Sequence, residues 1–564
     1  MKQLIECVPN FSEGIDLEVI KAITDEIESV DGVKLLDVDP GKATNRTVVT
    51  FVGTPNEVVD AAFKAIKKAS ELIEMSSHSG EHPRMGATDV CPLIPISNIT
   101  MEETVKYAEK LGERVGSELN IPIYLYESAA RNEERKNLAN IRSGEYEGFF
   151  QKISLPEWAP DYGPSEFNKS AGATAIGARD FLVAYNVNLN TTSVRRANAV
   201  AFDIREKGRV KREGSPITGK IVRDEKGEPL RVPGKLKSVK AIGWFIEEYG
   251  IAQISMNLTD IKVTQLHTAF EAVRESANKR GMRVTGSELV GLVPKKVLID
   301  AGKYFLEKQE RSVGISDEEI IKIAVKSLGL DELSEFDPKK KVIEYLLSED
   351  DLRPLVKKDL ISFANETASE SPAPGGGSIA AYVGALGASL GTMVANLSAH
   401  KRGWDDQWHF FSQKAQEGQK LKDKLLYLVD EDTKAFNKII DAIRLPKSTG
   451  QEKKARIKAL NDATKYAIQI PYEIMETAFK SYDLLRTMTD KGNPASISDG
   501  GVGALCTHTA IYGAYLNVII NCNDFDDQQF VSATIQKADD LLSRSKKIHE
   551  EILEKTIKAT YPKK

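Results

Sequence analysis

Residues 181–189 read FLVAYNVNL, a stretch in which apolar and polar positions alternate. Alternation with a period of two is typical of a β-strand, because successive side chains point to opposite faces. A helical pattern follows at 192–207. The next elements are strands at 241–246 and 251–258, a helix at 263–279 and a strand at 284–287. The order is therefore strand, helix, strand, strand, helix, strand.

The same order occurs once before, within the first hundred residues. Strands are expected at 5–8, 33–38, 46–52 and 91–95, and helices at 16–30 and 56–73. This is the split βαβ arrangement of a ferredoxin-like unit. The sequence thus predicts an α/β (α+β) part built of two βαββαβ ferredoxin-like subdomains, at 1–180 and 181–325.

The sequence pattern changes after Pro338. Long helical periods run through residues 340–564, and breaking residues gather only at 372–377, 445–450 and 491–503. We therefore expect an all-α helical-bundle domain at 340–564, joined to the first part by a linker at 326–339.

Composition limits the classes of protein to which the chain can belong. With 77 Lys and Arg against 82 Asp and Glu, the net charge of −5 argues against general binding to nucleic acid or an anionic membrane. The four cysteines include no CxxC pair, which argues against a disulfide framework or a zinc site. Because the N-terminus lacks the apolar core of a signal peptide, we expect a cytoplasmic protein.

Residues 371–399 carry no charge and are long enough to span a membrane. They are rich in Gly, Ala and Ser, however, whereas a lipid-facing helix favours Leu, Ile and Phe. Small residues recur at helical spacing, which allows neighbouring backbones to approach closely. We expect a buried helix of the bundle.

The loop at 77–89, SHSGEHPRMGATD, contains two of the seven histidines. His78 and His82 are four residues apart, but they do not form the HExxH motif of a zinc helix, because a glycine lies between them and Pro83 disfavours a helix at His82. A metal site is therefore not indicated. Two interpretations stay open. The loop is either an ordinary polar turn or the support of a histidine whose charged neighbours set its pKa for acid–base catalysis.

Other glycine-rich or acidic segments have weaker individual signals. Residues 163–179, GPSEFNKSAGATAIGAR, match no nucleotide-binding motif and form either a plain connection or a wall that a flat ligand can approach. Gly375–Gly377 begins a helix with free backbone N–H groups that suit an anion or a polar ring. Residues 429–436 place three acids within a helix, where a solvated face is the common role. Residues 493–501 begin a second uncharged helix.

Taken together, these segments resemble the bifunctional formiminotransferase–cyclodeaminase family along essentially the whole chain. The transferase-like segments are GEHPRMGATDVCPLIP (80–95), GPSEFNKSAGATAIGARDFL (163–182) and GSELVGLVP (286–294). The cyclodeaminase-like segments are SPAPGGGSIAA (371–381), VDEDTKAFN (429–437) and GNPASISDGGVGAL (492–505).

The resemblance implies two consecutive reactions. A formimino group passes from N-formimino-L-glutamate to N5 of tetrahydrofolate, and the product then closes onto N10 with release of ammonia, giving 5,10-methenyltetrahydrofolate. Tetrahydrofolate, expected to be polyglutamylated, is then the only cofactor, and no metal is required. The partners are small molecules rather than nucleic acid or membrane, and the family suggests a homo-oligomer.

The resemblance also assigns residues. The catalytic histidine falls on His82 and the active-site aspartate on Asp432. The folate-contacting segment falls on Gly163, Pro164, Ser165, Glu166, Phe167, Asn168, Lys169, Ser170, Ala171 and Gly172. Further cofactor-binding candidates are Gly375, Gly376 and Gly377, and substrate-binding candidates are Asp39, Arg84, Asp89, Asn493 and Asp499.

These residue types suit the implied chemistry. A single imidazole can take a proton from N5 and give one to the departing glutamate nitrogen. Asp39 and Asp89 can orient it or hold the amidinium, and Arg84 can hold a carboxylate. A carboxyl group partly removed from water has a raised pKa and can protonate the leaving ammonia. Helical spacing places Asp432 one turn before Phe436, whereas Asp430 points elsewhere.

Two other functions remain open at this stage. One activity alone can be retained, for example a methenyltetrahydrofolate cyclohydrolase in the helical domain. Alternatively, the chain is a non-catalytic folate-binding scaffold in which His82 is structural. Separate measurements of methenyl absorbance and of ammonia release distinguish the bifunctional enzyme from these two alternatives.

Overall fold

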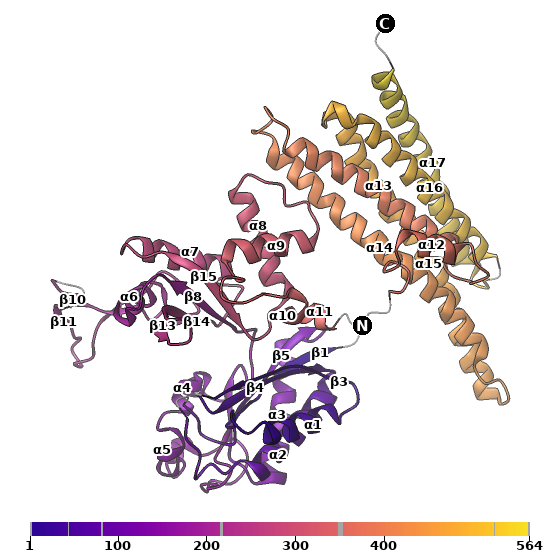
Figure 1. Ribbon diagram of the computed structural model, residues 1–564. Coiled ribbons are helices and arrows are strands. Elements are labelled where there is room, and N and C mark those ends of the chain that lie inside the picture. The colour runs from indigo at the N-terminus through magenta and orange to yellow at the C-terminus, as the bar shows by residue number, and fades with distance from the viewer. Residues whose placement is uncertain are drawn as a thin grey trace. The chain divides into compact units, whose positions relative to one another are not determined.

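The computed structural model describes residues 3–42, 44–80, 83–214, 218–347, 353–523 and 525–561 (Figure 1). The chain forms two compact units. The first, the sheet unit, contains residues 1–297 and 328–349, and the second, the helical unit, contains residues 298–327 and 350–564.

The sheet unit begins with a mixed β-sheet. Its strands are β1 (Leu4–Cys7), β2 (Asn10–Phe11), β3 (Val33–Gly41), β4 (Arg46–Gly53), β5 (Thr88–Ser97), β6 (Ile123–Glu127) and β7 (Thr174–Ala178). Both β1 and β2 pair with β4 and β5, so together they act as one interrupted strand between them. The strand β3 pairs antiparallel with β4, while β7 lies parallel to both β5 and β6.

Three amphipathic helices pack on this sheet: α1 (Leu17–Glu28), α2 (Pro55–Leu72) and α3 (Met101–Leu119) (Figure 1). Local sequence explains where they begin. Asp16 accepts hydrogen bonds from the first backbone N–H groups of α1, Pro55 occupies the first turn of α2, and Thr100 and Glu103 form a capping box on α3. The apolar side chains of the helices and the sheet form one buried core.

The predicted βαββαβ order is present here, but the sheet is larger than expected. The strand predicted at 91–95 extends over Thr88–Ser97, and β6 and β7 were not predicted. Between them lie two short helices, α4 (Leu138–Ile141) and α5 (Glu145–Lys152). They pack on tyrosines of β6 in a second, smaller core, which gives this region a layer that the simple unit lacks.

The second sheet is entirely antiparallel, in the order β13 (Val239–Ile246), β14 (Ile251–Leu258), β8 (Val183–Leu189) and β15 (Val284–Val290). Its helices are α6 (Val194–Ile204) and α7 (Leu266–Asn278). Four two-residue strands, β9 to β12, form two small antiparallel pairs between α6 and β13.

The strand predicted at 181–189 is present as β8, and the side chains on both of its faces are largely buried. Asn188 accepts a hydrogen bond from Gln253 at 2.8 Å and donates one to Glu332 at 2.8 Å. The polar positions of β8 are therefore buried because their hydrogen bonds are satisfied by other side chains.

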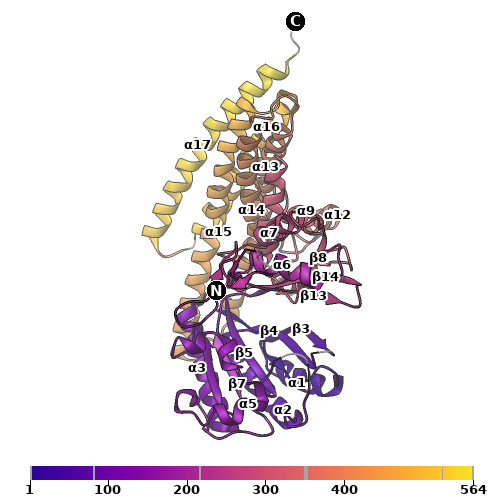
Figure 2. The same cartoon turned by 90° about the vertical axis from the view of Figure 1, so that its left-hand side faces the viewer.

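The helical unit contains five long helices: α13 (Gly376–Ala399), α14 (Trp408–Arg444), α15 (Gly450–Lys491), α16 (Ile497–Cys522) and α17 (Gln528–Thr560). Figures 1 and 2 show them running alongside one another. The short helix α12 (Leu360–Thr367) precedes them.

Glycines allow α13 and α16 to approach closely. A Cβ atom on Gly387 would lie 2.9 Å from the carbonyl oxygen of Gly503, and one on Gly384 would lie 3.1 Å from the Cβ of Ala510. Both α13 and the segment Pro494–Cys522 are long and apolar enough to cross a membrane, and 61% and 39% of their most apolar windows are buried inside the protein. The expectation of a buried bundle helix is confirmed for α13.

The boundary between the units differs from the predicted one. The helices α8 (Lys295–Lys308) and α9 (Asp317–Leu328) are grouped mainly with the helical unit, whereas residues 328–349 are grouped with the sheets. The turn between α8 and α9 explains this. The Val313 N–H donates to Ser412 Oγ at 3.0 Å, and Gly314 packs against Ala415 without space for a side chain.

Candidate functional site

In the first sheet, the loop before β5 lies against residues 163–172, so the structure brings together two segments that the sequence singled out separately. Gly86 and Gly172 form a β-bridge. The Ala87 N–H donates to the Ala171 carbonyl at 2.9 Å, and the Met75 N–H donates to the Ser170 carbonyl at 2.9 Å. These backbone bonds fix one segment against the other.

This contact requires glycine on both sides. Gly172 has φ of +67°, a conformation that favours glycine, and a Cβ there would overlap the Met85 carbonyl oxygen. A Cβ on Gly86 would overlap the Ala173 carbonyl oxygen. The glycines are therefore needed for the loop and the segment to meet.

Glu81 and His82 lie outside the described residues, so the structure defines their surroundings only. On one side, His78 Nε2 donates to the Asn45 carbonyl at 3.0 Å, while its Nδ1 accepts from Arg84 Nε at 3.3 Å. These two contacts fix the orientation of the His78 ring. His78 supports the loop.

Arg84 has a different environment from the one expected. Its buried guanidinium contacts Glu147 at 2.6 Å and Glu145 at 3.2 Å, both from α5. The hydrogen bond to Glu147 is the largest cause of a raised pKa at Arg84. Because two carboxylates of this chain already occupy the guanidinium, Arg84 joins α5 to the loop rather than offering an empty site for a substrate carboxylate.

Asp89 is also engaged within the protein. Its fully buried carboxylate accepts from the Met85 N–H at 3.1 Å and from Arg142 through Nε at 3.3 Å and a short second contact. A carboxylate so engaged holds the turn before β5, and substrate binding by Asp89 stays a prediction.

Asp39, by contrast, is exposed on β3. Arg46, at the start of β4, is near enough to interact with it: burial and Arg142 lower the pKa of Arg46, whereas Asp89 and Asp39 act in the opposite direction. Asp39 is therefore the candidate acid of this region that stays open to a ligand.

The segment 163–172 has an exposed and a buried part. Ser165, Glu166, Lys169 and Ser170 are exposed, whereas Ala171 and Gly172 are buried against the loop. The Phe167 ring lies 5.3 Å from Tyr146 and 6.4 Å from Phe150, of which Phe150 is 53% exposed. An accessible aromatic surface of this kind can pack against a flat ring.

In the helical unit, Gly375–Gly377 and Asp432 meet. A Cβ on Gly377 would overlap the Asp432 carboxyl group, so the first turn of α13 approaches α14 directly. Ser378 Oγ lies 3.1 Å from Asp432 Oδ2. Asn517 of α16 forms another wall, with its Nδ2 3.3 Å from where a Cβ on Gly376 would lie.

Burial raises the pKa of Asp432, and the Ser378 side chain and N–H only partly oppose this. Its two acidic neighbours differ. Asp430 accepts the Leu355 N–H at 2.9 Å, on another side of the helix as predicted. Hydrogen bonds from Lys434 and Tyr466 outweigh burial and lower the pKa of Glu431. Asp432, beside Gly377, is therefore an acid whose pKa burial raises.

Asn493 and Asp499 do not share this site. The Asn493 N–H donates to Ser398 Oγ at 2.8 Å, near the C-terminal end of α13. Residues 377 and 398 are separated by 21 helical steps, or roughly 30 Å. Within one chain Asn493 thus lies far from Asp432, and substrate binding by Asn493 and Asp499 stays a prediction.

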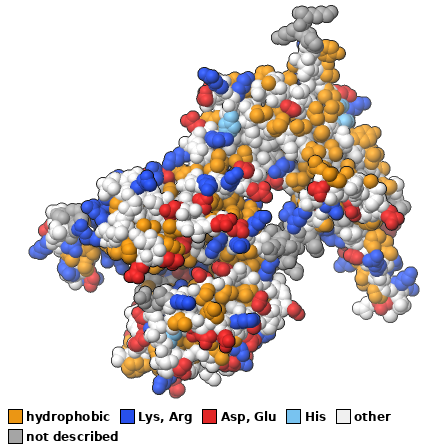
Figure 3. All heavy atoms as spheres, in the orientation of Figure 1, with side chains coloured by type: hydrophobic (Ala, Val, Ile, Leu, Met, Phe, Trp, Pro, Cys, Tyr) orange, Lys and Arg blue, Asp and Glu red, His pale blue; other side chains and the backbone are white. Residues whose placement is uncertain are grey.

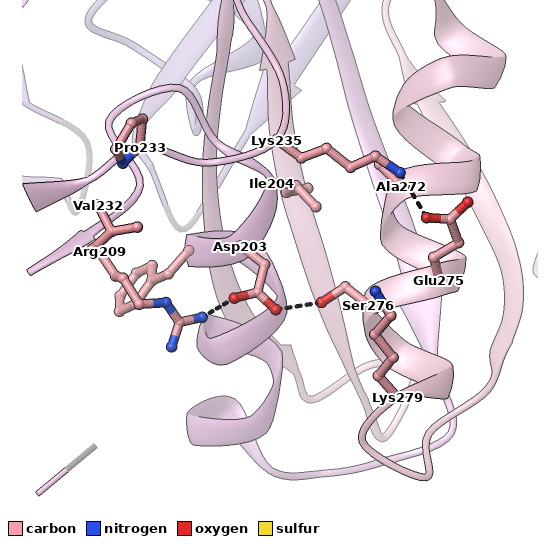
Figure 4. Close-up of a pocket in the computed structure, with 11 residues that line it drawn as sticks. Asp203, Ile204, Arg209, Val232, Pro233, Lys235, Ala272, Glu275, Ser276 and Lys279 are labelled. Atoms are coloured by element: carbon pink, nitrogen blue, oxygen red, sulfur yellow. Dashed lines mark hydrogen bonds and ion pairs between the residues drawn. The ribbon is translucent and has the colours of Figure 1, made fainter. Parts of the chain in front are cut away.

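A separate cavity of about 230 Å³ lies between α6 and α7 in the second sheet region (Figure 4). Asp203 accepts from Ser276 Oγ at 2.7 Å and contacts Arg209, and Lys235 pairs with Glu275 at 2.6 Å. None of the described residues predicted as sites lines this cavity. Asp203, Arg209, Lys235 and Glu275 thus bond to groups of the protein itself.

Comparison with known proteins divides the chain into three matched regions. Residues 4–179 match the N-terminal subdomain of the formiminotransferase domain, 184–348 the formiminotransferase domain and 359–540 formiminotransferase-cyclodeaminase. The formimidoyltransferase-cyclodeaminase of Mus musculus is 43% identical over 547 residues, which cover 97% of each chain. The chain belongs to the formimidoyltransferase-cyclodeaminase family.

Two shorter relatives match one half each of this family member. The glutamate formimidoyltransferase of Streptococcus pyogenes is 42% identical over 310 residues, 55% of this chain and 95% of its own. The methenyltetrahydrofolate cyclohydrolase of Methylorubrum extorquens is 33% identical over 198 residues, 35% of this chain and 95% of its own.

Several residues near the two family regions were missed from the sequence. Arg142 and Glu147 lie more than fifty residues from the loop they hold, and no motif connects them to it. Asn517 had a usable signal, since it is a lone amide within the apolar run IYGAYLNVII. Its contact with the start of α13 still needed the antiparallel packing of the two helices.

The contact at Gly377 leads to a matched pair of variants. Gly377→Ala should lower ammonia release from 5-formiminotetrahydrofolate at least about 10²-fold, because the new methyl group displaces Asp432. Gly375→Ala should stay within about twofold, since its Cβ would have only the Pro372 carbonyl near it, at 3.9 Å. Equal losses in both variants would contradict this geometry.

Proposed function

We propose that this protein transfers the formimino group of N-formimino-L-glutamate to N5 of tetrahydrofolate and then cyclises the product to 5,10-methenyltetrahydrofolate, releasing ammonia. The observation that carries this is the continuous 97% match to a bifunctional relative, in which both halves of the chain participate. The reactions belong to histidine degradation and one-carbon metabolism.

For the transfer we propose His82 as the group that carries protons. N5 attacks the amidine carbon, a tetrahedral centre forms, and the glutamate nitrogen departs after protonation. The residues flanking His82 support this role, because the loop is held on both sides by backbone bonds and by the contacts of Arg84. Asp39 is the acid proposed to hold the amidinium or orient the imidazole.

The folate is proposed to lie along residues 163–172. Exposed polar groups of this segment and the aromatic surface of Phe150 and Phe167 adjoin the loop that contains His82. A pterin or aminobenzoyl ring can pack on such a surface. Tetrahydrofolate, in polyglutamylated form, is the proposed carrier, and both reactions proceed by proton transfer without a metal.

For ring closure we propose Asp432 as the general acid. N10 attacks the formimino carbon, and ammonia leaves only when its nitrogen is protonated. Burial supports this role, because it raises the pKa of Asp432 and favours the form that can donate. The absence of a side chain at Gly377 lets the start of α13 pack against this carboxyl group.

The cyclohydrolase relative gives a second candidate for the helical half, hydrolysis of 5,10-methenyltetrahydrofolate. The two activities share the folate carbon between N5 and N10 but differ in the leaving group. Ammonia formed from 5-formiminotetrahydrofolate supports the first. Loss of methenyl absorbance from supplied 5,10-methenyltetrahydrofolate, without ammonia formation from the formimino compound, supports the second.

We also propose a cytoplasmic homo-oligomer. An apolar stripe on α13 and α16 supports self-association, and its members are at least 38% exposed: Leu386, Met393, Leu397, Val502, Leu505, Tyr512, Leu516 and Ile520. Figure 3 shows hydrophobic side chains gathered over this part of the helical unit. Contiguous apolar surface of this kind is uncommon on a monomer, and a second copy of the chain would cover it.

His82→Gln should reduce formimino transfer by about 10²- to 10⁴-fold, because the proton carrier is lost. Ammonia release from supplied 5-formiminotetrahydrofolate should persist, since it uses residues of the other unit. Both rates are measured on the full chain. Undiminished transfer would exclude His82 from this role.

Asp432→Asn should give the opposite result, with transfer retained and ammonia release reduced by about 10²-fold or more. In the unaltered protein the active form of Asp432 is protonated. Ammonia release should therefore fall as the pH rises through the raised pKa of Asp432 and be fully present below it. Normal ammonia release from the Asn variant would remove Asp432 from the mechanism.

The double variant Leu516→Lys, Ile520→Lys should dissociate the oligomer, because two charges would have to be buried at the contact. Light scattering during gel filtration should then give a mass near the 62.2 kDa of one chain. Ile457→Lys serves as a control, since Ile457 is 60% exposed but lies outside the stripe. An unchanged mass for the double variant would place the contact elsewhere.

A further inference from the structure

Ser378 has an unusual set of neighbours in the first turn of α13. It is fully buried, and its hydroxyl oxygen lies near three other oxygen atoms. These are the Val429 carbonyl at 2.8 Å, Asp432 Oδ2 at 3.1 Å and Thr433 Oγ1 at 3.3 Å. All three come from one turn of α14.

A hydroxyl group has one proton to donate, so these contacts depend on one another. The Val429 carbonyl only accepts, and it is the nearest of the three oxygens. When Ser378 donates to it, a lone pair of Oγ faces Asp432 Oδ2. The contact with Asp432 is then a hydrogen bond only if the carboxyl group carries its proton on Oδ2.

The ionised form of Asp432 requires a different arrangement. The Ser378 hydroxyl then turns from Val429 and donates to the carboxylate. Little is lost at Val429, because its carbonyl lies inside α14 and keeps the hydrogen bond of the helix itself. One rotation of a hydroxyl group thus separates two satisfied states of the same network.

We infer that Ser378 is a positioning residue for ring closure: it holds the Asp432 carboxyl group in place before transfer and stabilises the carboxylate afterwards. This inference rests on the proposed role of Asp432 as the acid. Ser378 itself needs no contact with the folate, because it acts through the carboxyl group.

Proton transfer and the departure of ammonia balance in atoms and electrons. The O–H group of Asp432 first turns from Ser378 Oγ toward the substrate, and its O–H bond then breaks as an N–H bond forms on the amine of the tetrahedral intermediate. The C–N bond then breaks, and its electron pair leaves with ammonia, while the lone pair of N5 forms the new C=N bond. Asp432 is left as a carboxylate that accepts the Ser378 hydroxyl, and solvent later returns the proton.

The negative charge of the carboxylate determines the direction in which Ser378 shifts the pKa of Asp432. A hydrogen bond to a carboxylate is stronger than one to a neutral carboxyl group, so Ser378 favours the ionised form. Its N–H at the start of α13 acts in the same direction. Ser378 thereby opposes the burial that raises the pKa of Asp432.

The test is the pH dependence of ammonia release by the full chain supplied with 5-formiminotetrahydrofolate. In Ser378→Ala, the alkaline limb of the profile should move to higher pH by about one unit, with a lower maximal rate. In Ser378→Cys, which keeps nearly the same volume, the weaker donor should give a smaller shift in the same direction. A purely structural defect lowers the rate at every pH without moving the limb.

Ser389→Ala is the matched control, because Ser389 is on the same helix but donates to the Ala385 carbonyl of α13 at 2.7 Å. Its profile should coincide with that of the unaltered protein. Coincident limbs for Ser378→Ala and the unaltered protein would overturn the inference, as would a shift to lower pH. If Ser378→Ala does not fold, as judged by thermal melting, the Cys variant decides. Normal ammonia release by Asp432→Asn would instead show that the proposed acid is wrong.

Discussion

The contact between Gly377 and Asp432 controls the arrangement of the helical unit around its candidate site. Any side chain at Gly377 would occupy the place of the carboxyl group. With only hydrogen there, the first turn of α13 reaches α14, which removes Asp432 from water and brings Ser378 to it. The same physical constraint acts in the first sheet, where Gly86 and Gly172 let the loop before β5 meet residues 163–172. In both units, glycines let two segments of backbone approach closely, and the candidate site lies where they meet.

The charged groups of the protein also differ in how strongly ion pairs and hydrogen bonds within the chain hold them. Asp89 and Asp430 are as buried as any acid in the chain, yet each is bonded to N–H groups or to an arginine that it holds in place. Arg84 is bonded to two glutamates. Asp39 and Asp432 differ, because the first is exposed and burial dominates the pKa of the second. Whether a charged group is already held by an ion pair or by several hydrogen bonds, rather than its charge or burial alone, separates the candidate catalytic groups from the structural ones.

The two proposed reactions also place different demands on the two units. Formimino transfer needs a group that both accepts and donates a proton, which suits an imidazole on a loop supported by a rigid sheet. Ring closure needs an acid that keeps its proton near neutral pH, which suits a carboxyl group within a helix bundle. A carrier that is the product of one reaction and the substrate of the other explains why both belong on one chain. The exposed apolar stripe of α13 and α16 is the surface on which we propose self-association.

Much of the fold could be predicted from sequence because it depends on local periodicity. The alternation in residues 181–189, the repeated βαββαβ order and the change to long helices all appear as elements of the structure. The resemblance also identified the segments that carry the sites.

Long-range contacts could not be predicted in the same way. The bonding of Arg84 to Glu147, the third layer formed by α4 and α5, and the grouping of residues 298–327 with the bundle join parts distant in sequence.

The sequence by itself thus determined the order of elements, the family and the identity of Asp432 as a candidate acid. Only the tertiary structure decided which of the candidates are open to a ligand. Asn493 and Asp432 illustrate this, since both lie in conspicuous motifs, yet the antiparallel path of α13 and α16 places them at opposite ends of one helix. Periodicity along a chain is a local property, whereas hydrogen-bond partners and burial depend on which distant segments pack together.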